Sequence, residues 1–176
     1  DYEEVLVVDL KAKKLTARIP LQPSQDIWPT RYNGLALTPD GTQLFAVSCT
    51  TRSLMAVDLR TNQLTDTIGV GNCPSAVRLS SDGKRVFVLQ QHGYTAMTIL
   101  DAQSHRTIRT VPFPDGVAGT LDFVLSPDDR RAYISCYDAN IVLLVDLVTE
   151  DPARRIVTFI QSGQDPMGIA ATADRK

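Results

Sequence analysis

The sequence has little of what marks several large classes of protein. No uninterrupted apolar run approaches the ~18 residues of a membrane-spanning helix, and the first residues, Asp-Tyr-Glu-Glu, are unlike the basic and apolar start of a signal peptide. Its 18 Lys and Arg side chains are balanced by 20 Asp and Glu, so the formal net charge is −2. Nucleic acids and anionic membranes are bound by clustered Lys and Arg. Neither partner is expected, and no membrane span is expected.

Cysteine and histidine are also scarce. Cys49, Cys73 and Cys136 form no Cys-x-x-Cys motif, and an odd count leaves at least one of them unpaired within the chain. Cys49 and Cys73 could approach each other on one face, and the sequence leaves open whether they form a disulfide. We find no Gly-rich phosphate loop, nucleophile elbow or His-Glu-x-x-His helix. We therefore assign no catalytic residue, no metal site and no cofactor.

The sequence does contain an internal repeat. Turns of the Thr-Pro-Asp-Gly type recur, and their aspartates are separated by 42, 46 and 46 residues. A second aspartate, at the end of a β-branched run, follows the first after 18, 19 and 18 residues. A fixed period of this size determines the architecture. The first aspartates are Asp40, Asp82, Asp128 and Asp174, and the second are Asp58, Asp101 and Asp146, with Asp9 as a further copy near the start.

Turn signals divide each repeat into four short strands. No stretch keeps an apolar 3.6-residue period over ten residues, so no helix is expected. Four strands in about 44 residues is the pattern of a propeller blade. The predicted fold class is therefore all-β, a β-propeller built of four-stranded antiparallel blades. The second strands, for example, are expected at 43–48, 85–90 and 131–136.

The two ends of the chain carry incomplete blades. We expect one propeller segment over 1–176, with partial blades at 1–22 and 166–176, the latter holding a first strand at Ile169–Thr172. Full blades are expected at about 32–71, 74–113 and 120–162. These 15 strands do not close a ring, because closed propellers have 4 to 8 complete blades. We expect a piece of a larger propeller completed by further blades; the alternative is a ring completed by a second copy of the chain.

At these residues the sequence resembles the YVTN-type β-propeller repeat family over essentially its whole length. The matching segments are Pro166-Met167-Gly168-Ile169-Ala170, Ser81-Asp82-Gly83-Lys84-Arg85-Val86-Phe87-Val88, Ala56-Val57-Asp58-Leu59 and Thr67-Ile68-Gly69-Val70-Gly71. The family's Asn after the second strand is replaced by Ser48, Gln90 and Cys136, and the turn glycine is replaced by Asp129 and Arg175. The resemblance implies a binding module at a secreted, periplasmic or cell-surface location. Relatives by fold include lactonases and amine dehydrogenase heavy chains.

Candidate binding residues lie in loops that a propeller gathers at one face and in the strands that line its channel. Arg78 and Asp122 replace small or apolar residues of the other repeats, so they either form an ion pair between blades or contact a ligand. Trp28 either contacts a ligand or fills the gap between two blades. The full candidate set is Trp28, Arg31, Tyr32, Arg78, His92, Tyr94, Asp122, Tyr137 and Asp138.

The remaining aspartates are expected to have structural roles. The recurrence of Asp9, Asp58, Asp101 and Asp146 in every repeat favours turn capping over chemistry. Carboxylates from different blades could bind a hard cation at the channel mouth, although solvated turn aspartates are the alternative. These carboxylates are Asp115, Asp122, Asp138 and Asp165.

The sequence therefore predicts a non-enzymatic module that binds a protein, peptide or saccharide through its loop face and channel mouth. The alternative is a segment of a propeller enzyme, either a lactonase-like metal-dependent hydrolase or an amine-dehydrogenase-like subunit. A third hypothesis is an architectural piece whose only partners are further blades.

Overall fold

The computed structural model describes residues 2–23, 34–91 and 95–172, and almost all of its regular structure is β-strand. The first two strands form a hairpin, and the next twelve form three four-stranded sheets. Each of these sheets is antiparallel and keeps its strands in chain order. The hairpin is β1 (Tyr2–Asp9) and β2 (Lys14–Pro23).

We call the three sheets blade 1, blade 2 and blade 3. Blade 1 contains β3 (Leu35–Leu37), β4 (Gln43–Ser48), β5 (Ser53–Asp58) and β6 (Gln63–Gly69). Blade 2 contains β7 (Pro74–Leu79), β8 (Arg85–Gln90), β9 (Ala96–Asp101) and β10 (Thr107–Pro112). Blade 3 contains β11 (Thr120–Leu125), β12 (Arg131–Cys136), β13 (Ile141–Asp146) and β14 (Ile156–Gln161).

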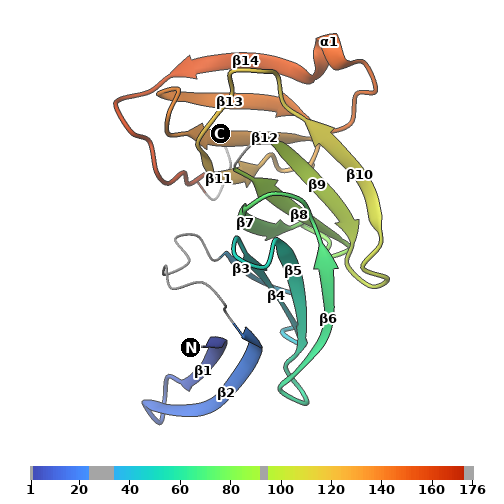
Figure 1. The fold of residues 1–176 in the computed structure, drawn as a ribbon, viewed down its shortest axis with the longest axis vertical. Helices are drawn as coiled ribbons and strands as arrows, with labels where there is room; N and C mark the ends of the chain where they lie inside the picture. Colours follow the sequence, from blue (N-terminus) through green and yellow to red (C-terminus); the bar gives the residue numbers. More distant parts are fainter. Residues whose placement is uncertain (1, 24–33, 92–94, 173–176) are drawn as a thin grey trace.

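The sheets follow one another along an arc, from the hairpin at one end to blade 3 at the other (Figure 1). The first strands β3, β7 and β11 lie on the inner side of this arc, and β6, β10 and β14 lie along its outer rim (Figure 1). The fold class predicted from the repeat, a partial β-propeller, is confirmed. In the described part of the chain, no helix is long and apolar enough to cross a bilayer.

The repeated aspartates lie in the turns that follow the strands, at the positions that the sequence predicted. Asp40 accepts hydrogen bonds from the Thr38 hydroxyl at 2.6 Å and the Thr42 amide at 3.1 Å, and the same turn recurs around Asp82 and Asp128. The second aspartates cap the turns between third and fourth strands by accepting bonds from backbone amides two and three residues on. This capping is confirmed for Asp9, Asp58, Asp101 and Asp146.

The apolar core lies between neighbouring blades. One cluster joins blades 1 and 2 around Phe45, and a larger one joins blades 2 and 3 around Phe87 and Phe123; all three rings are fully buried. A third cluster, which includes Ile19 and Val57, attaches the hairpin to blade 1. Each sheet is therefore stabilised chiefly by burying a face against its neighbour, because burial of apolar area is the main favourable term in folding.

All three outer strands contain a β-bulge at the same place. The register shifts between Ala56 and Val57 in blade 1, and at the corresponding positions of blades 2 and 3. On each outer strand, the residue that directly follows the bulge is therefore equivalent in the three blades. Its partner on the third strand lies two positions before the capping aspartate. We call the residue on the outer strand the rim position; it is Asp66 in β6, Arg109 in β10 and Thr158 in β14.

Two expectations about secondary structure are wrong. A one-turn helix, α1 (Pro152–Arg155), precedes β14, with the Asp151 carboxylate accepting from the Ala153 amide at 3.0 Å. The first strand predicted at Ile169–Thr172 is not formed, and this segment has no regular structure. A strand needs a hydrogen-bonded neighbour, and no described strand pairs with these residues.

Candidate functional site

Four of the nine candidate residues fall within the described structure: Arg78, Asp122, Tyr137 and Asp138. Their elements are β7, β11 and the connection between β12 and β13. The other candidates lie outside the described residues, so their contacts remain predictions; these are Trp28, Arg31, Tyr32, His92 and Tyr94.

Arg78 and Asp122 form an ion pair between the inner strands of blades 2 and 3. The Arg78 Nη2 atom donates to Asp122 Oδ1 at 2.7 Å, and its Nη1 atom donates to the Val77 carbonyl at 3.1 Å. The guanidinium also lies 5.7 Å from the centre of the Phe123 ring, a cation–π distance. The predicted inter-blade ion pair is therefore present. The Arg78 side chain is still 40% exposed, so pairing does not remove it from solvent.

A hollow of about 240 Å³ lies beside this ion pair. It is lined by Arg78 and Leu79 of β7, Val124 and Leu125 of β11, Asp129 and Ala171. The lining combines a guanidinium and a carboxylate with aliphatic side chains. A few convergent polar groups beside apolar side chains can fix the orientation of a bound ligand.

Tyr137 and Asp138 are exposed at the end of β12. The Tyr137 amide donates to the Gly119 carbonyl at 2.8 Å, which fixes this connection against the start of β11. Gly119 has φ +67°, and a Cβ atom there would lie 2.7 Å from the Asp138 amide and from its Oδ2 atom. Glycine is therefore required for Asp138 to sit where it does.

Cys49 and Cys73 form a disulfide, a pairing that the sequence left open. It joins the connection after β4 in blade 1 to the connection just before β7 in blade 2. Cys73 is 5% exposed and has φ 43°, in the left-handed region that non-glycine residues rarely adopt. The third cysteine, Cys136, is buried, and burial raises the pKa of its thiol to about 11. Cys136 therefore stays protonated at neutral pH and is a poor nucleophile.

The carboxylates that might have met at the channel mouth do not form a metal-ligand cluster. Within residues 2–23, 34–91 and 95–172, no three His, Cys, Asp or Glu side chains come close enough to hold a metal ion. Asp122 is instead paired with Arg78, and the Asp165 amide donates to the Asn140 side chain at 2.8 Å.

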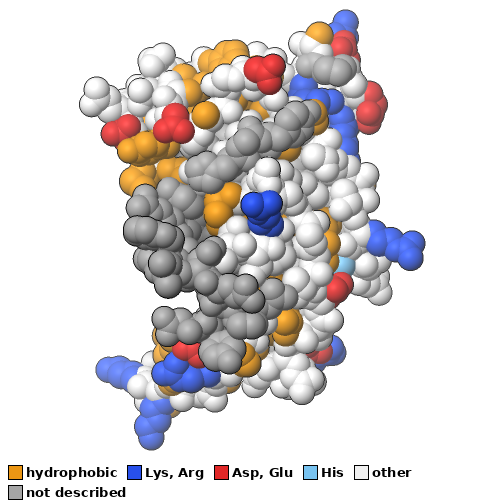
Figure 2. Space-filling view, in the orientation of Figure 1, with side chains coloured by type: hydrophobic (Ala, Val, Ile, Leu, Met, Phe, Trp, Pro, Cys, Tyr) orange, Lys and Arg blue, Asp and Glu red, His pale blue; other side chains and the backbone are white. Residues whose placement is uncertain are grey.

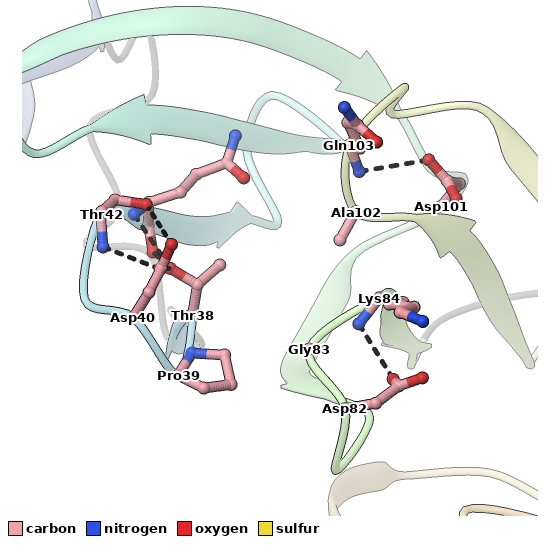
Figure 3. Close-up of a pocket in the computed structure, with 11 residues that line it drawn as sticks. Thr38, Pro39, Asp40, Thr42, Asp82, Gly83, Lys84, Asp101, Ala102 and Gln103 are labelled. Atoms are coloured by element: carbon pink, nitrogen blue, oxygen red, sulfur yellow. Dashed lines mark hydrogen bonds between the residues drawn. The ribbon is translucent and has the colours of Figure 1, made fainter.

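A larger hollow, of about 470 Å³, lies between the turns of blade 1 and blade 2. Figure 3 shows Asp40 and Thr42 on one side of this groove, with Asp82, Lys84 and Asp101 on the other. The hydroxyl of Thr38 lowers the pKa of Asp40, and the Ser80 hydroxyl lowers that of Asp82. The groove is therefore anionic at neutral pH.

The turn of blade 2 that lines this groove has a glycine where the equivalent turn of blade 3 has an aspartate. Gly83 has φ +71°, and a Cβ atom there would lie 2.7 Å from the Pro39 ring. The equivalent residue of the next repeat is Asp129, which also has positive φ. Its buried carboxylate accepts from the amide and hydroxyl of Ser81, both at 2.8 Å, and so bridges blades 2 and 3.

Sequence reasoning missed Asp129 and His105 as inter-blade contacts. For Asp129 a signal is available, because a charged side chain stands where other repeats have glycine. His105 lies in a polar turn, and nothing in the local sequence indicates a contact. In the structure its Nδ1 atom lies 2.8 Å from Asp66 Oδ2 and its Nε2 atom 3.0 Å from Gln43 Nε2, so the ring links blade 2 to blade 1.

One sequence relative of this chain is a β-propeller protein. No family model matches the chain. The seven-bladed beta-propeller protein Rv1057 of Mycobacterium tuberculosis is 28% identical to it over 104 residues, which is 58% of this chain. The match spans only 26% of that protein's length. A chain of Kuenenia stuttgartiensis hydrazine synthase superposes with a TM-score of 0.43 and 14% identity, over 98% of this chain and 84% of that one.

The repeated turns, the three four-stranded sheets and the propeller relative lead to one conclusion. The chain is a β-propeller segment with three complete blades in its described residues.

Proposed function

We propose that this chain is a non-catalytic binding module that holds a carboxylate-bearing peptide segment of a partner protein. The segment lies on the inner strands of blades 2 and 3, with Tyr137 and Asp138 at its edge. The observation that supports this proposal is the position of Arg78, which is 40% exposed beside a hollow with aliphatic side chains in its lining and is held in place by Asp122.

The chemistry of the guanidinium favours this ligand. Arginine carries five N–H donors, and the described hydrogen bonds of Arg78 engage only its Nη1 and Nη2 atoms. Its planar fork suits bidentate pairing with a carboxylate. Phe123 beneath the guanidinium and Asp122 beside it restrict its rotamers, so less conformational entropy is lost when a ligand binds. The enzyme alternatives rest on the family resemblance alone, and no contact in the described residues favours them.

The test must separate ligand binding from the structural role of the ion pair. We would screen an array of acidic and neutral peptides, together with acidic saccharides, and measure the affinity of the best ligand by calorimetry. The key variant is the double exchange Arg78→Asp with Asp122→Arg, which keeps an ion pair between the blades but moves the positive charge to β11. Arg60→Ala is the control, because Arg60 pairs with Asp58 in a turn of blade 1 and does not line the hollow beside Arg78.

We expect an acidic peptide to bind the wild type and the Arg60→Ala variant equally. The exchanged pair should stay folded and lose at least tenfold in affinity. Equal binding by the exchanged pair, selection of saccharides over peptides, or no preference for acidic peptides would each contradict the proposal.

A further inference from the structure

A third hollow, of about 560 Å³, lies at the turn between β11 and β12 and is larger than the two hollows already described. Its lining includes Asp128 and Arg130 of the turn, Arg131 and Tyr133 of β12, and Asp146 at the end of β13. Figure 2 shows Lys and Arg side chains beside Asp and Glu side chains at the end of blade 3 where Figure 1 places α1, in the connection that follows β13. This hollow shares no lining residue with the one on β7 and β11, so the two are separate.

Several donors of this hollow have no partner among the described residues. The guanidiniums of Arg130 and Arg131 form no hydrogen bond and no ion pair with a described residue, although the backbone amides of both residues do form hydrogen bonds. The Tyr133 hydroxyl likewise forms no hydrogen bond within the described part of the chain. Each arginine carries five N–H donors. The hollow therefore has many donors to offer to a ligand.

The two carboxylates of the hollow are engaged by their own turns. Asp128 Oδ1 accepts from the Ser126 hydroxyl at 2.6 Å, which lowers the pKa of Asp128. Asp146 Oδ1 accepts from the Thr149 amide at 2.9 Å, which lowers the pKa of Asp146, and the charge of Arg131 adds to this effect. Both carboxylates are therefore ionised at neutral pH and balance the charge of the two arginines. An anion here would be held by directed hydrogen bonds rather than by excess positive charge.

The boundary between blades 2 and 3 contains the same position with a carboxylate bound to it. Arg85 is the equivalent of Arg131 in blade 2, and its Nη2 atom lies 3.9 Å from the Asp129 carboxylate of the next blade. The amide and hydroxyl of Ser81 donate to the same oxygen of Asp129, both at 2.8 Å. In blade 3, Pro127 replaces Ser81 and has no N–H or hydroxyl to donate, so the arginines become the main donors.

Blade 3 also has donors at this place that blade 2 lacks. Arg130 replaces Lys84, and Tyr133 replaces Phe87, so each change adds N–H or O–H groups. In the following repeat, the residue that corresponds to the bridging acid of blade 3 is Arg175. The repeat therefore has a base and not an acid at this position of its next turn, and we expect a carboxylate to come from another molecule.

We propose that this hollow is a binding site for a carboxylate group, held by the guanidiniums of Arg130 and Arg131 with the Tyr133 hydroxyl as a further donor. The planar fork of a guanidinium matches the two oxygens of a carboxylate. A phosphate carries about −1.5 to −2 charges at neutral pH, so the ionised Asp128 and Asp146 repel it more strongly than they repel a carboxylate. A small organic acid and an acidic side chain both supply the chemistry of this site.

A titration of the whole chain followed by amide NMR shifts, at constant ionic strength, tests the proposal. The probes are acetate, the end-capped peptide Gly-Asp-Gly, its neutral counterpart Gly-Asn-Gly, and inorganic phosphate. Acetate and the aspartate peptide should shift the amides of residues 126–133 with affinities in the millimolar range. Phosphate should bind more weakly, and the asparagine peptide should cause no shift there.

The key variant replaces both arginines with the residues that blade 1 has at the same positions, Arg130→Thr with Arg131→Gln. Since blade 1 forms the same turn and strand with Thr42 and Gln43, this variant should fold, and the retained pattern of amide shifts checks that it does. It should lose at least tenfold in affinity for acetate, because hydrogen bonds to charged donors are lost. Tyr133→Phe should lose about threefold. Lys84→Thr is the matched control in blade 2 and should bind like the wild type.

Three results would overturn the proposal: no shift at about 50 mM acetate, tighter binding of phosphate than of acetate, or equal binding by the double arginine variant and the wild type. Shifts centred on β7 and β11 would also overturn it, because they would locate the anion beside Arg78. That last result would leave the function proposed for the inner strands standing, so the two proposals fail separately.

Discussion

Blades 1 and 2 meet through a different chemistry from blades 2 and 3, although both interfaces are built by the same repeat. The first interface has the Cys49–Cys73 disulfide and the contact between His105 and Asp66. The second has no disulfide and relies on polar contacts that cross the boundary at several levels. The Ser75 hydroxyl donates to the Thr120 carbonyl at 3.0 Å, and the Thr120 hydroxyl donates to the Gln90 carbonyl at 2.7 Å. Side-chain hydrogen bonds also join Arg78 to Asp122 and Ser81 to Asp129, and Arg109 donates to three carbonyls of blade 3.

The difference shows that the repeat specifies where blades touch and single substitutions specify how they are joined. The same rim position supplies an acid to one boundary and a base to the other. The same turn position is Gly83 at one boundary, where it lies against Pro39, and Asp129 at the other, where a carboxylate accepts hydrogen bonds from Ser81. Beyond the apolar clusters that stabilise both interfaces, the first is therefore sensitive to reduction and acid, and the second is held by hydrogen bonds and ion pairs.

The largest expected effect comes from removing the disulfide. Replacing both Cys49 and Cys73 with Ser should lower the free energy of unfolding by about 3 kcal/mol, because the bond constrains the unfolded chain across a separation of 24 residues. Urea denaturation checks this value. Cys136→Ser is a poor control because Cys136 is buried, so the fitting control is the wild type with and without a reducing agent. An unchanged midpoint would show that the bond contributes nothing to the first interface.

Removing Arg109 should break the second interface at its rim. Arg109→Met keeps much of the aliphatic stem and removes the donors to the carbonyls of Leu147, Val148 and Thr149. We expect a loss of about 2 kcal/mol, since hydrogen bonds to charged donors contribute more than neutral ones. The matched variant Arg106→Met alters an exposed arginine in the nearby turn and should change stability by less than about 0.5 kcal/mol. Equal effects of the two variants would contradict the role given to Arg109.

Asp129→Gly should convert the second boundary toward the first. It removes the carboxylate that binds Ser81 and relieves the positive φ of 54°. The two changes oppose each other, so the net loss should be about 1 kcal/mol, smaller than that of Arg109→Met. Thermal denaturation measures the loss. A variant as stable as the wild type would contradict the bridging role given to Asp129.

Acid should weaken the first interface at its rim. The hydrogen bond from His105 lowers the pKa of Asp66 below its ordinary value. A lowered pKa stabilises the fold above the unfolded pKa of about 3.9, and this contribution disappears as the pH falls through the folded value. The stability difference between wild type and Asp66→Asn should therefore shrink below pH 4, from less than about 1 kcal/mol at pH 7. A difference that grows in acid would contradict this sign.

Much of the blade architecture was predictable because it depends on local signals. The second strands at 43–48, 85–90 and 131–136 were predicted residue for residue, since turn residues mark both ends of each. Helix α1 was missed, although Asp151 and Pro152 form an N-cap followed by proline, a known start signal. The segment Ile169–Thr172 has strand-like residues, but strand formation also needs a partner that local sequence does not provide.

The contacts between blades were harder to predict because they join residues between 24 and 62 positions apart. The contact between Arg78 and Asp122 was predictable because each is a charged residue where the other repeats have small or apolar residues. A charged residue on an inner strand indicates either an ion pair or a ligand contact, and the ion pair is present. The disulfide could not be predicted, because it depends on the distance between two loops that belong to different blades. His105 was missed because its partners Asp66 and Gln43 are on another blade.

The central claim, that single substitutions join equivalent blade boundaries by different chemistry, can be tested most directly by hydrogen exchange with and without a reducing agent. Reduction should increase exchange in blade 1 and in the connection around Cys49 and Cys73, while the amides of β11–β13 in blade 3 keep their protection. Equal loss of protection in blades 1 and 3, or no change in either, would contradict the account.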